Sequence, residues 1–152
     1  DTPRVFLNMG NVYFKKHDFQ KALENYEKSL EICYLKDYNN PNIANILTNI
    51  GLVLYEKKEY EKAIEYYQKA YEILRKIDSN DFNHPNLASI LNFIANAYFY
   101  KDENEKALEY YKRSYDVLNI IYGHDLSHPD MISIVNNINN AKLTIPNYDI
   151  FS

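Results

Sequence analysis

The chain has 152 residues and a mass of 18.0 kDa, the size of one ordinary domain. Its formal net charge of −4 argues against binding to nucleic acid or to an anionic membrane surface. The single cysteine excludes an intrachain disulfide and favours a reducing, cytoplasmic location. No apolar run approaches the length of a membrane span, and three isolated glycines exclude a glycine-rich phosphate loop. Because the chain opens at Asp1, we expect it to be a fragment of a longer protein.

Apolar residues recur at helical spacing along the whole chain. Ala63, Tyr67 and Leu74, for example, fall on one face of a helix. Three helices are predicted to start at a proline, where the missing N–H costs nothing, after an Asn or His that can cap the helix. The predicted helices cover residues 3–16, 19–36, 41–57, 60–77, 85–101, 104–122 and 129–143. Residues 145–152 are expected to form an irregular tail.

The sequence repeats itself. Three segments of 24 residues, starting at Met9, Ile50 and Ile94, align without gaps. A second, proline-containing motif recurs every 44 residues, which is also the spacing between the segments that start at Ile50 and Ile94. Its three copies are NPNIANIL, HPNLASIL and HPDMISIV. A period of this size indicates stacked supersecondary units. Short charged connections make the two helices of each unit antiparallel neighbours, so the sequence predicts an all-α fold.

The repeated residues resemble those of the tetratricopeptide repeat (TPR) family. The match rests on a small residue shortly before an aromatic one, and on an alanine followed four residues later by an aromatic residue. These pairs are Gly10/Tyr13, Ala95/Tyr98, Ala22/Tyr26, Ala63/Tyr67 and Ala107/Tyr111. The long repeat and the lead-in at His84 and Pro85 resemble the kinesin-light-chain subclass. The family's frequent Trp is absent, and Asn104 and Asn139 depart from the pattern.

This resemblance implies a right-handed superhelical solenoid spanning residues 1–144. It would contain three full units, at 3–36, 41–77 and 85–122, and a partial fourth at 129–143. The first helices of successive units would line a concave groove that binds a peptide or a helix of another protein. The resemblance thus implies a protein–protein interaction scaffold without enzymatic activity and without a cofactor.

Helical phase predicts which residues face that groove. They lie on the side of each first helix away from packing residues such as Phe6, Met9 and Gly10. Asparagine is frequent there, and its amide pairs with both the N–H and the C=O of a peptide. Aromatic residues nearby would form pockets that read the ligand's sequence. The candidate groove residues are Asn8, Asn11, Asn45, Asn49, Tyr55, Asn92, Asn96, Phe99, Tyr100, Asn137 and Asn140. The alternative is that these are ordinary solvated helix positions.

One family function is argued against. Members that bind chaperone tails grip a C-terminal carboxylate with one cation on the first of three successive first helices and two cations on the third. The matching positions here hold Leu7, Ser89 and Phe93, although the two amides of the clamp are present as Asn11 and Asn49. A carboxylate would be desolvated there without a charge partner, which is costly. The basic groove expected for acidic kinesin cargo motifs is also not evident.

Other residues offer weaker signals. His124 and His128 are spaced for metal binding, but no cysteine or carboxylate completes a ligand set, so a loop-capping role is favoured. Cys33 is expected in the core.

Two alternatives to the scaffold remain open. In the first alternative the chain is a self-associating segment, because the helix at 129–143 lacks a second helix to pair with. Either the tail (Ile145, Tyr148, Ile150 and Phe151) or another chain would then cover Val135 and Ile138. In the other, it is the regulatory module of a larger enzyme.

Overall fold

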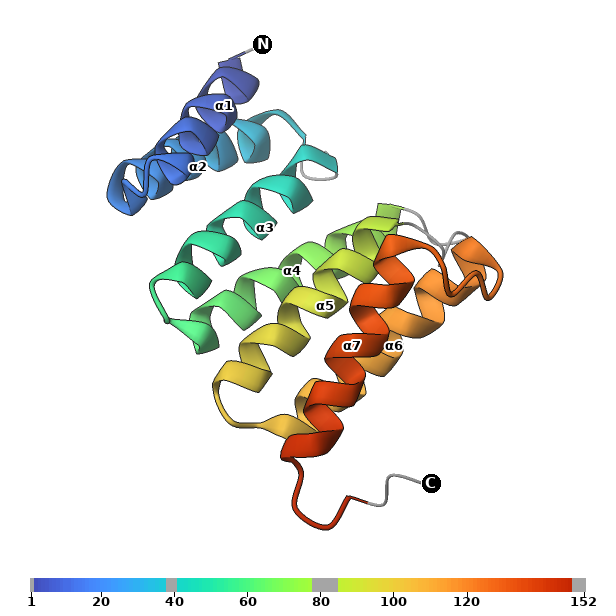
Figure 1. Cartoon of the computed structure of the whole chain (residues 1–152). Coiled ribbons are helices and arrows are strands. Elements are labelled where there is room, and N and C mark those ends of the chain that lie inside the picture. The colour runs from blue at the N-terminus through green and yellow to red at the C-terminus, as the bar shows by residue number, and fades with distance from the viewer. Residues whose placement is uncertain (1, 38–40, 78–84, 149–152) are drawn as a thin grey trace. The chain divides into compact units, whose positions relative to one another are not determined.

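The computed structural model describes residues 2–37, 41–77 and 85–148. These residues form seven α-helices and no β-strand (Figure 1). The helices are α1 (Thr2–Lys15), α2 (Phe19–Lys36), α3 (Pro41–Glu56), α4 (Tyr60–Ile77), α5 (Pro85–Tyr100), α6 (Asn104–Tyr122) and α7 (Pro129–Thr144). The predicted all-α class is confirmed, and each predicted helix end lies within one residue of the observed end.

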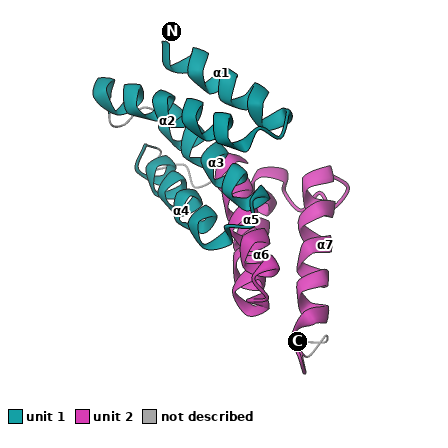
Figure 2. Cartoon of the chain, turned by 90° about the vertical axis from the view of Figure 1, so that its left-hand side faces the viewer, with its two compact units in different colours: residues 1–78 teal, residues 79–152 magenta. Residues whose placement is uncertain are grey.

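The chain divides into two compact units, residues 1–78 and 79–152 (Figure 2). In the first unit α1 packs against α2 and α3 against α4, while α2 also contacts α3. In the second unit α6 packs against both α5 and α7. The helices therefore pack in sequence order within each unit, as the repeat predicts.

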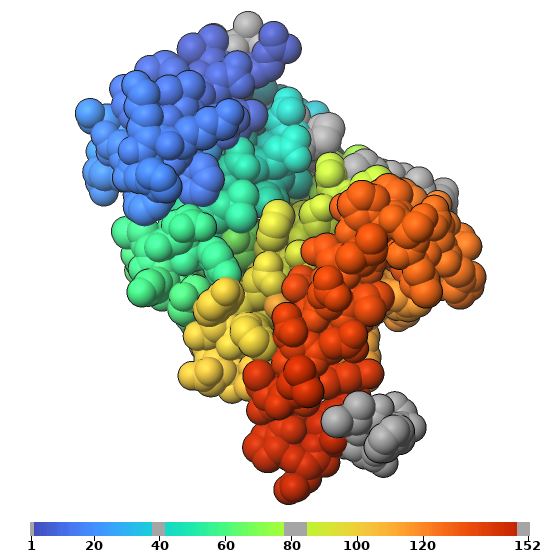
Figure 3. All heavy atoms as spheres, viewed as in Figure 1, coloured from blue at the N-terminus to red at the C-terminus, as the bar shows by residue number. Residues whose placement is uncertain are grey.

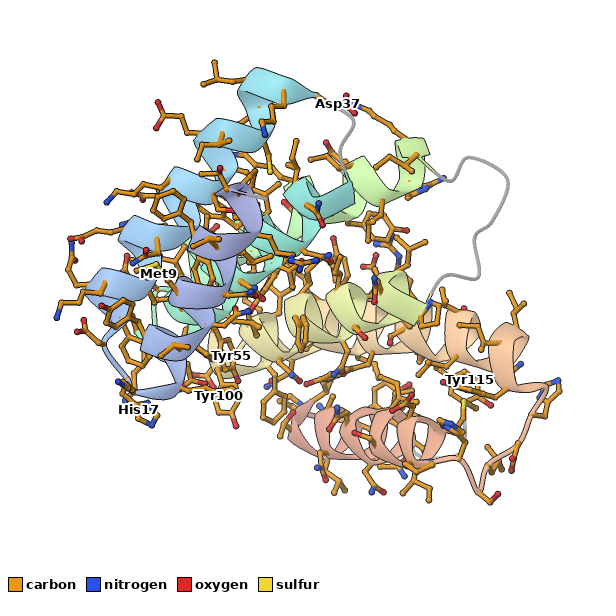
Figure 4. The ribbon with its side chains drawn as sticks, turned by 90° about the horizontal axis from the view of Figure 1, so that it is seen from above. Met9, His17, Asp37, Tyr55, Tyr100 and Tyr115 are labelled. Atoms are coloured by element: carbon orange, nitrogen blue, oxygen red, sulfur yellow. The ribbon has the colours of Figure 1, made fainter. Side chains whose placement is uncertain are left out.

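The turns inside the helix pairs share one backbone geometry. His17, Lys58 and Asp102 occupy equivalent positions and adopt the left-handed conformation, with φ of 58°, 62° and 61° (His17 is labelled in Figure 4). The N–H of the next residue donates to the carbonyl five residues before it, as in the 3.0 Å bond from Asp18 to Tyr13. This is a Schellman-type helix ending. It reverses the chain within a few residues and brings the second helix back along the first.

Proline and histidine start the later helices as predicted. Pro41, Pro85 and Pro129 are the first residues of α3, α5 and α7. The His128 side chain caps α7 by accepting a hydrogen bond from the backbone N–H of Asp130 through Nδ1, at 3.2 Å. The corresponding capping residues before Pro41 and Pro85 lie outside the described residues.

Small residues let the paired helices approach closely. A Cβ added to Gly10 would lie 2.4 Å from Cε1 of Tyr26, and one added to Gly51 would lie 2.5 Å from Cε1 of Tyr67. Both rings are buried, so each glycine provides the space that a tyrosine ring fills. Ala95, also fully buried, holds the equivalent position in α5.

Buried hydroxyl groups tie the first and second helices together. The Ser29 hydroxyl donates to the Pro3 carbonyl at 2.6 Å, and the Ser114 hydroxyl donates to the Ala88 carbonyl at 2.8 Å. Both serines are fully buried, and these bonds satisfy their polar groups inside the core. Cys33 is buried as predicted, and burial raises the pKa of its thiol.

The two ends of the described chain differ from each other. Met9, expected on the packing face of α1, has 41% of its surface exposed, so that prediction is wrong. The reason is that α1, unlike α3, has no earlier helix beside it among the described residues. At the other end, Ile145 and Tyr148 pack against the hydrophobic core of the second unit, as Val135 and Ile138 do. The described part of the tail therefore packs on the second unit, while Ile150 and Phe151 lie outside the described residues.

Candidate functional site

A tyrosine and two asparagines form a hydrogen-bonded chain in the first unit. The buried Tyr26 of α2 donates its hydroxyl to Oδ1 of Asn11 on α1, at 2.7 Å. Nδ2 of Asn49 on α3 donates to the same Oδ1 atom at 3.2 Å. The structure thus brings together two predicted site residues, Asn11 and Asn49, from two successive first helices.

These bonds determine what the Asn11 amide offers to a ligand. Burial raises the pKa of Tyr26 to about 12, so its hydroxyl remains a donor at neutral pH. Oδ1 of Asn11 accepts two hydrogen bonds, which matches the two lone pairs of a carbonyl-type oxygen. Within the described residues, Nδ2 of Asn11 has no protein acceptor. Asn11 therefore presents N–H donors in a fixed direction.

A hollow of about 180 Å³ surrounds this group. It is lined by Asn11, Phe14, Lys15, Tyr26, Asn49 and Leu52. An amide donor, an apolar ring and a cation thus meet on one surface of the first unit. This combination suits a peptide, whose backbone pairs with amides and whose side chains need apolar contact.

The second unit repeats the arrangement with a variation. The Tyr111 hydroxyl on α6 donates to Oδ1 of Asn96 on α5 at 2.6 Å. Burial raises the pKa of Tyr111 as well, so it too remains a donor. Nδ2 of Asn137 on α7 donates to Oδ1 of Asn92 on α5 at 3.1 Å, one helical turn from Asn96. Helices α5 and α7 therefore lie next to each other, and Figure 3 shows their atoms side by side.

The other predicted site residues have different surroundings. Asn45 and Asn140 are exposed side chains on α3 and α7. The ring of Tyr55 packs edge to face with Tyr60, with centroids 5.5 Å apart. Asn8 lines a separate hollow, together with Met9 and other residues of α1.

A second aromatic pair lies at the C-terminal end of α5. The rings of Phe99 and Tyr100 contact each other edge to face, with centroids 5.7 Å apart. Tyr100 keeps 59% of its surface exposed, and Phe99 packs against the core cluster of the second unit. Tyr100 is thus the more accessible of the two predicted aromatic residues.

The orienting role of the buried tyrosines was not predicted. From the sequence, Tyr26 and Tyr111 are identified only as aromatic residues of the repeat pattern. A signal was present, because each lies 15 residues after the asparagine that accepts its hydroxyl. In the second helix pair Leu52 occupies the position of Asn11 and Asn96, so this tyrosine–asparagine pair is absent there.

Neither a metal centre nor a membrane-spanning helix is found in the described ranges. No group of three or more His, Cys, Asp or Glu side chains is arranged to hold a metal ion in residues 2–37, 41–77 and 85–148. His128 instead stacks on Tyr122, with ring centroids 3.7 Å apart. In the same residues, every helix is too short or too polar to cross a membrane.

Comparison with known proteins supports the family resemblance. Residues 1–76 and residues 87–130 each match a family described as tetratricopeptide repeat. A search of curated proteins gave no match. Among solved structures, BtubC (BKLC) from P. vanneervenii superposes with a TM-score of 0.83 at 19% identity. That alignment covers 93% of this chain and 56% of BtubC, so the chain spans little more than half of that protein.

Two further structures are similar. A putative kinesin light chain of P. anserina with nearly identical TPR-like repeats gives a TM-score of 0.78 at 15% identity, covering 93% of this chain and 65% of that one. The TPR2AB domain of yeast Sti1, solved as a complex with pHSP90, gives 0.68 at 26% identity, covering 93% and 46%. Since one family match alone covers half of the sequence, the chain belongs to the tetratricopeptide repeat family.

Proposed function

We propose that the chain is a protein-interaction module that binds an extended or helical segment of a partner protein through the amide groups of its first helices. The observation that carries this proposal is the bond from Tyr26 to Asn11, with Asn49 bound to the same oxygen. The bond satisfies the buried hydroxyl of Tyr26 and at the same time fixes the direction of a partly exposed amide, which water alone would leave free to rotate.

The ligand would be recognised in two ways. The oriented N–H groups of Asn11 and Asn96 would pair with carbonyl oxygens of the ligand backbone, which every sequence offers. Phe14 in the first unit and Tyr100 in the second would contact apolar side chains. The acidic overall balance favours a protein ligand over a nucleic acid.

We propose that this ligand is not a chaperone tail held by its C-terminal carboxylate. Yeast Sti1 domains are similar in fold and were solved as complexes with pHSP90 and with pHsp70. In the present chain, however, the clamp positions that need cations hold Leu7, Ser89 and Phe93. A terminal carboxylate would lose water there and gain no ion pair. An internal segment, which carries no terminal charge, avoids this cost.

We also propose that the chain belongs to the kinesin-light-chain-like group of long repeats. The support is the repeat length of 41 to 44 residues between equivalent alanines (Ala22, Ala63 and Ala107), against 34 residues in the basic type. The similar kinesin light chain is only 15% identical, so that likeness supports the fold alone. The assignment to the long-repeat group therefore rests on the repeat length.

The test begins with peptides selected on the purified chain from a random twelve-residue library that has amidated C-termini. Asn11→Ala and Asn49→Ala are then assayed for binding of the selected peptides by fluorescence anisotropy. We expect about a fivefold loss of affinity for each variant, since a hydrogen bond is worth about 1 kcal/mol. Asn139→Ala, an exposed amide on the opposite side of α7 from Asn137, is the matched control and should bind normally.

Two results would reject the proposal. One is unchanged affinity in folded Asn11→Ala and Asn49→Ala variants. The other is selection of peptides that bind only when their C-terminus carries a free carboxylate. That result would show that the chain binds a terminal carboxylate, as the chaperone-binding members do. Far-ultraviolet circular dichroism shows whether each variant is folded.

A further inference from the structure

A hollow of about 100 Å³ lies between α5, α6 and α7 in the second unit. The polar side chains that α5 and α7 contribute to it are Ser89 and Asn92, and Asp130 and Ser133. Their spacing of three residues places each pair on one face of its helix. Among the described residues that line it, only Asp130 is charged, and α5 has no charged residue. We call this acidic space the Asp130 hollow.

The carboxylate of Asp130 is held in place by its neighbours. The hydroxyl of Tyr122, the last residue of α6, donates to Oδ2 of Asp130 at 3.1 Å. Nδ1 of His128 lies 3.8 Å from the same oxygen, but it accepts the backbone N–H of Asp130 at 3.2 Å. A ring nitrogen that accepts a hydrogen bond carries no proton, so His128 supplies no positive charge. In the described residues, Asp130 has no Lys or Arg partner.

The other polar groups around the hollow can also accept hydrogen bonds. The Ser89 hydroxyl donates to the Pro85 carbonyl at 3.3 Å, which leaves the lone pairs of its oxygen for a ligand. Oδ1 of Asn92 accepts one bond, from Nδ2 of Asn137, and has a second lone pair. Acceptors from two helices and one negative charge therefore surround the same small space.

The rest of the lining is apolar. Ala88, Leu118 and Ile134 line the hollow and are each at most 7% exposed. A side chain that enters needs an aliphatic stem for these contacts and a cationic head with several donors. Arginine meets both needs, because its guanidinium carries five N–H donors in a planar fork that fits a carboxylate. The ammonium of lysine has three donors and is more strongly hydrated.

The charge here is opposite to that of a carboxylate clamp. Ser89 occupies one of the positions at which the chaperone-binding members need a cation, and Asp130 lines the same hollow from the next first helix. A ligand carboxylate would be repelled by Asp130, whereas a cation would be attracted.

We propose that the Asp130 hollow binds an arginine side chain of the partner segment. The guanidinium pairs with the Asp130 carboxylate and donates to the oxygens around it, while the stem lies on Leu118 and Ile134. The hollow serves the same ligand as the Asn11 amide, so its role rests on the proposed function. It adds a side chain by which the ligand's sequence is read.

The peptides selected on the chain supply the probe, and fluorescence anisotropy supplies the readout. We expect the selected peptides to share an arginine at one position. Replacing it with citrulline, which keeps the shape and removes the charge, should weaken binding about fivefold, as expected for a charged hydrogen bond partly screened by water. Lysine at that position should weaken binding about twofold, because it lacks the planar fork.

Three variants of the chain complete the experiment. Asp130→Asn removes the charge and should weaken the arginine peptides about fivefold, with no further loss for the citrulline peptides. Ser133→Val, at an exposed position, narrows the hollow and should also weaken the arginine peptides. Asp116→Asn is the matched control, since Asp116 is an exposed residue of α6 that does not line the hollow, and it should bind normally.

Four outcomes would overturn the proposal: selected peptides without a shared arginine, equal affinity of the citrulline peptides, unchanged affinity in folded Asp130→Asn, or an equal loss in Asp116→Asn. The last would show a general effect of charge. The two sites can fail separately, because Asn11 lies in the first unit and Asp130 in the second. A loss in Asn11→Ala without one in Asp130→Asn would reject the arginine site and leave the proposed function standing.

Discussion

Substituting Gly10 with alanine should damage both the core and the amide group. The new Cβ would lie 2.4 Å from Cε1 and 2.5 Å from Cδ1 of Tyr26, so the ring must move by about 1 Å to reach normal contact. Overpacking of this kind costs about 1–3 kcal/mol, and the better helix propensity of alanine returns up to about 1 kcal/mol. We therefore expect a net loss of about 1–2 kcal/mol in the free energy of unfolding.

The same displacement reaches the site. Tyr26 donates to Asn11 at 2.7 Å, and a shift of about 1 Å exceeds the tolerance of that bond. Gly10→Ala should therefore weaken binding of the selected peptides, although Gly10 is buried and does not touch the ligand.

Urea denaturation and fluorescence anisotropy measure the two effects. Ala95→Gly is the comparison, because Ala95 holds the equivalent position and Tyr111 already accommodates its methyl group. It should lose about 1 kcal/mol through helix propensity and leave the first unit's amide group intact. A Gly10→Ala variant with wild-type stability and wild-type peptide affinity would refute the reasoning.

Three further changes have expected outcomes. Ala63→Leu overfills a fully buried position and should lower the unfolding free energy by about 1–3 kcal/mol in urea titrations; a melting curve like that of the wild type would contradict the close packing of the helix pair. Lys58→Gly should raise the free energy of unfolding by about 0.5–1 kcal/mol, since φ of 62° strains a residue with a side chain. A lower free energy of unfolding in the same urea titration would contradict this. Because burial raises the pKa of Tyr26 from 10.0 to about 12, the unfolded chain ionises first, and stability falls as the pH rises between those values. Tyr26→Phe should reduce that fall by about 2–3 kcal/mol, measured by chemical denaturation at several pH values; an identical pH dependence would show that Tyr26 is not the group responsible.

The sequence predicted the helices well because strong local signals coincide at their ends. Pro41, Pro85 and Pro129 cannot continue a preceding helix and fit the first turn of a new one. Between them, apolar residues keep a helical period over sixteen or more residues, which leaves no competing register. The prediction that Met9 is buried was wrong because periodicity shows which face of a helix is apolar and does not show whether a neighbouring helix covers that face.

The site was only partly predictable, for a different physical reason. Helical phase placed Asn11 and Asn49 on the same side of their helices, and the structure bonds them to each other. Phase could not identify the hydroxyl of Tyr26 as the donor that orients them, since this contact depends on how two helices pack. Asn45 and Asn140 are exposed and remain predictions.

Oδ1 of Asn11 already accepts two hydrogen bonds, and this limits the groups that Asn11 can offer to a ligand. Asn11 therefore gives a bound segment only N–H groups. A proline in the ligand keeps its carbonyl and lacks only the N–H. Proline facing Asn11 would thus sacrifice no pairing, and selected ligands should accept an imino acid at that place along their length.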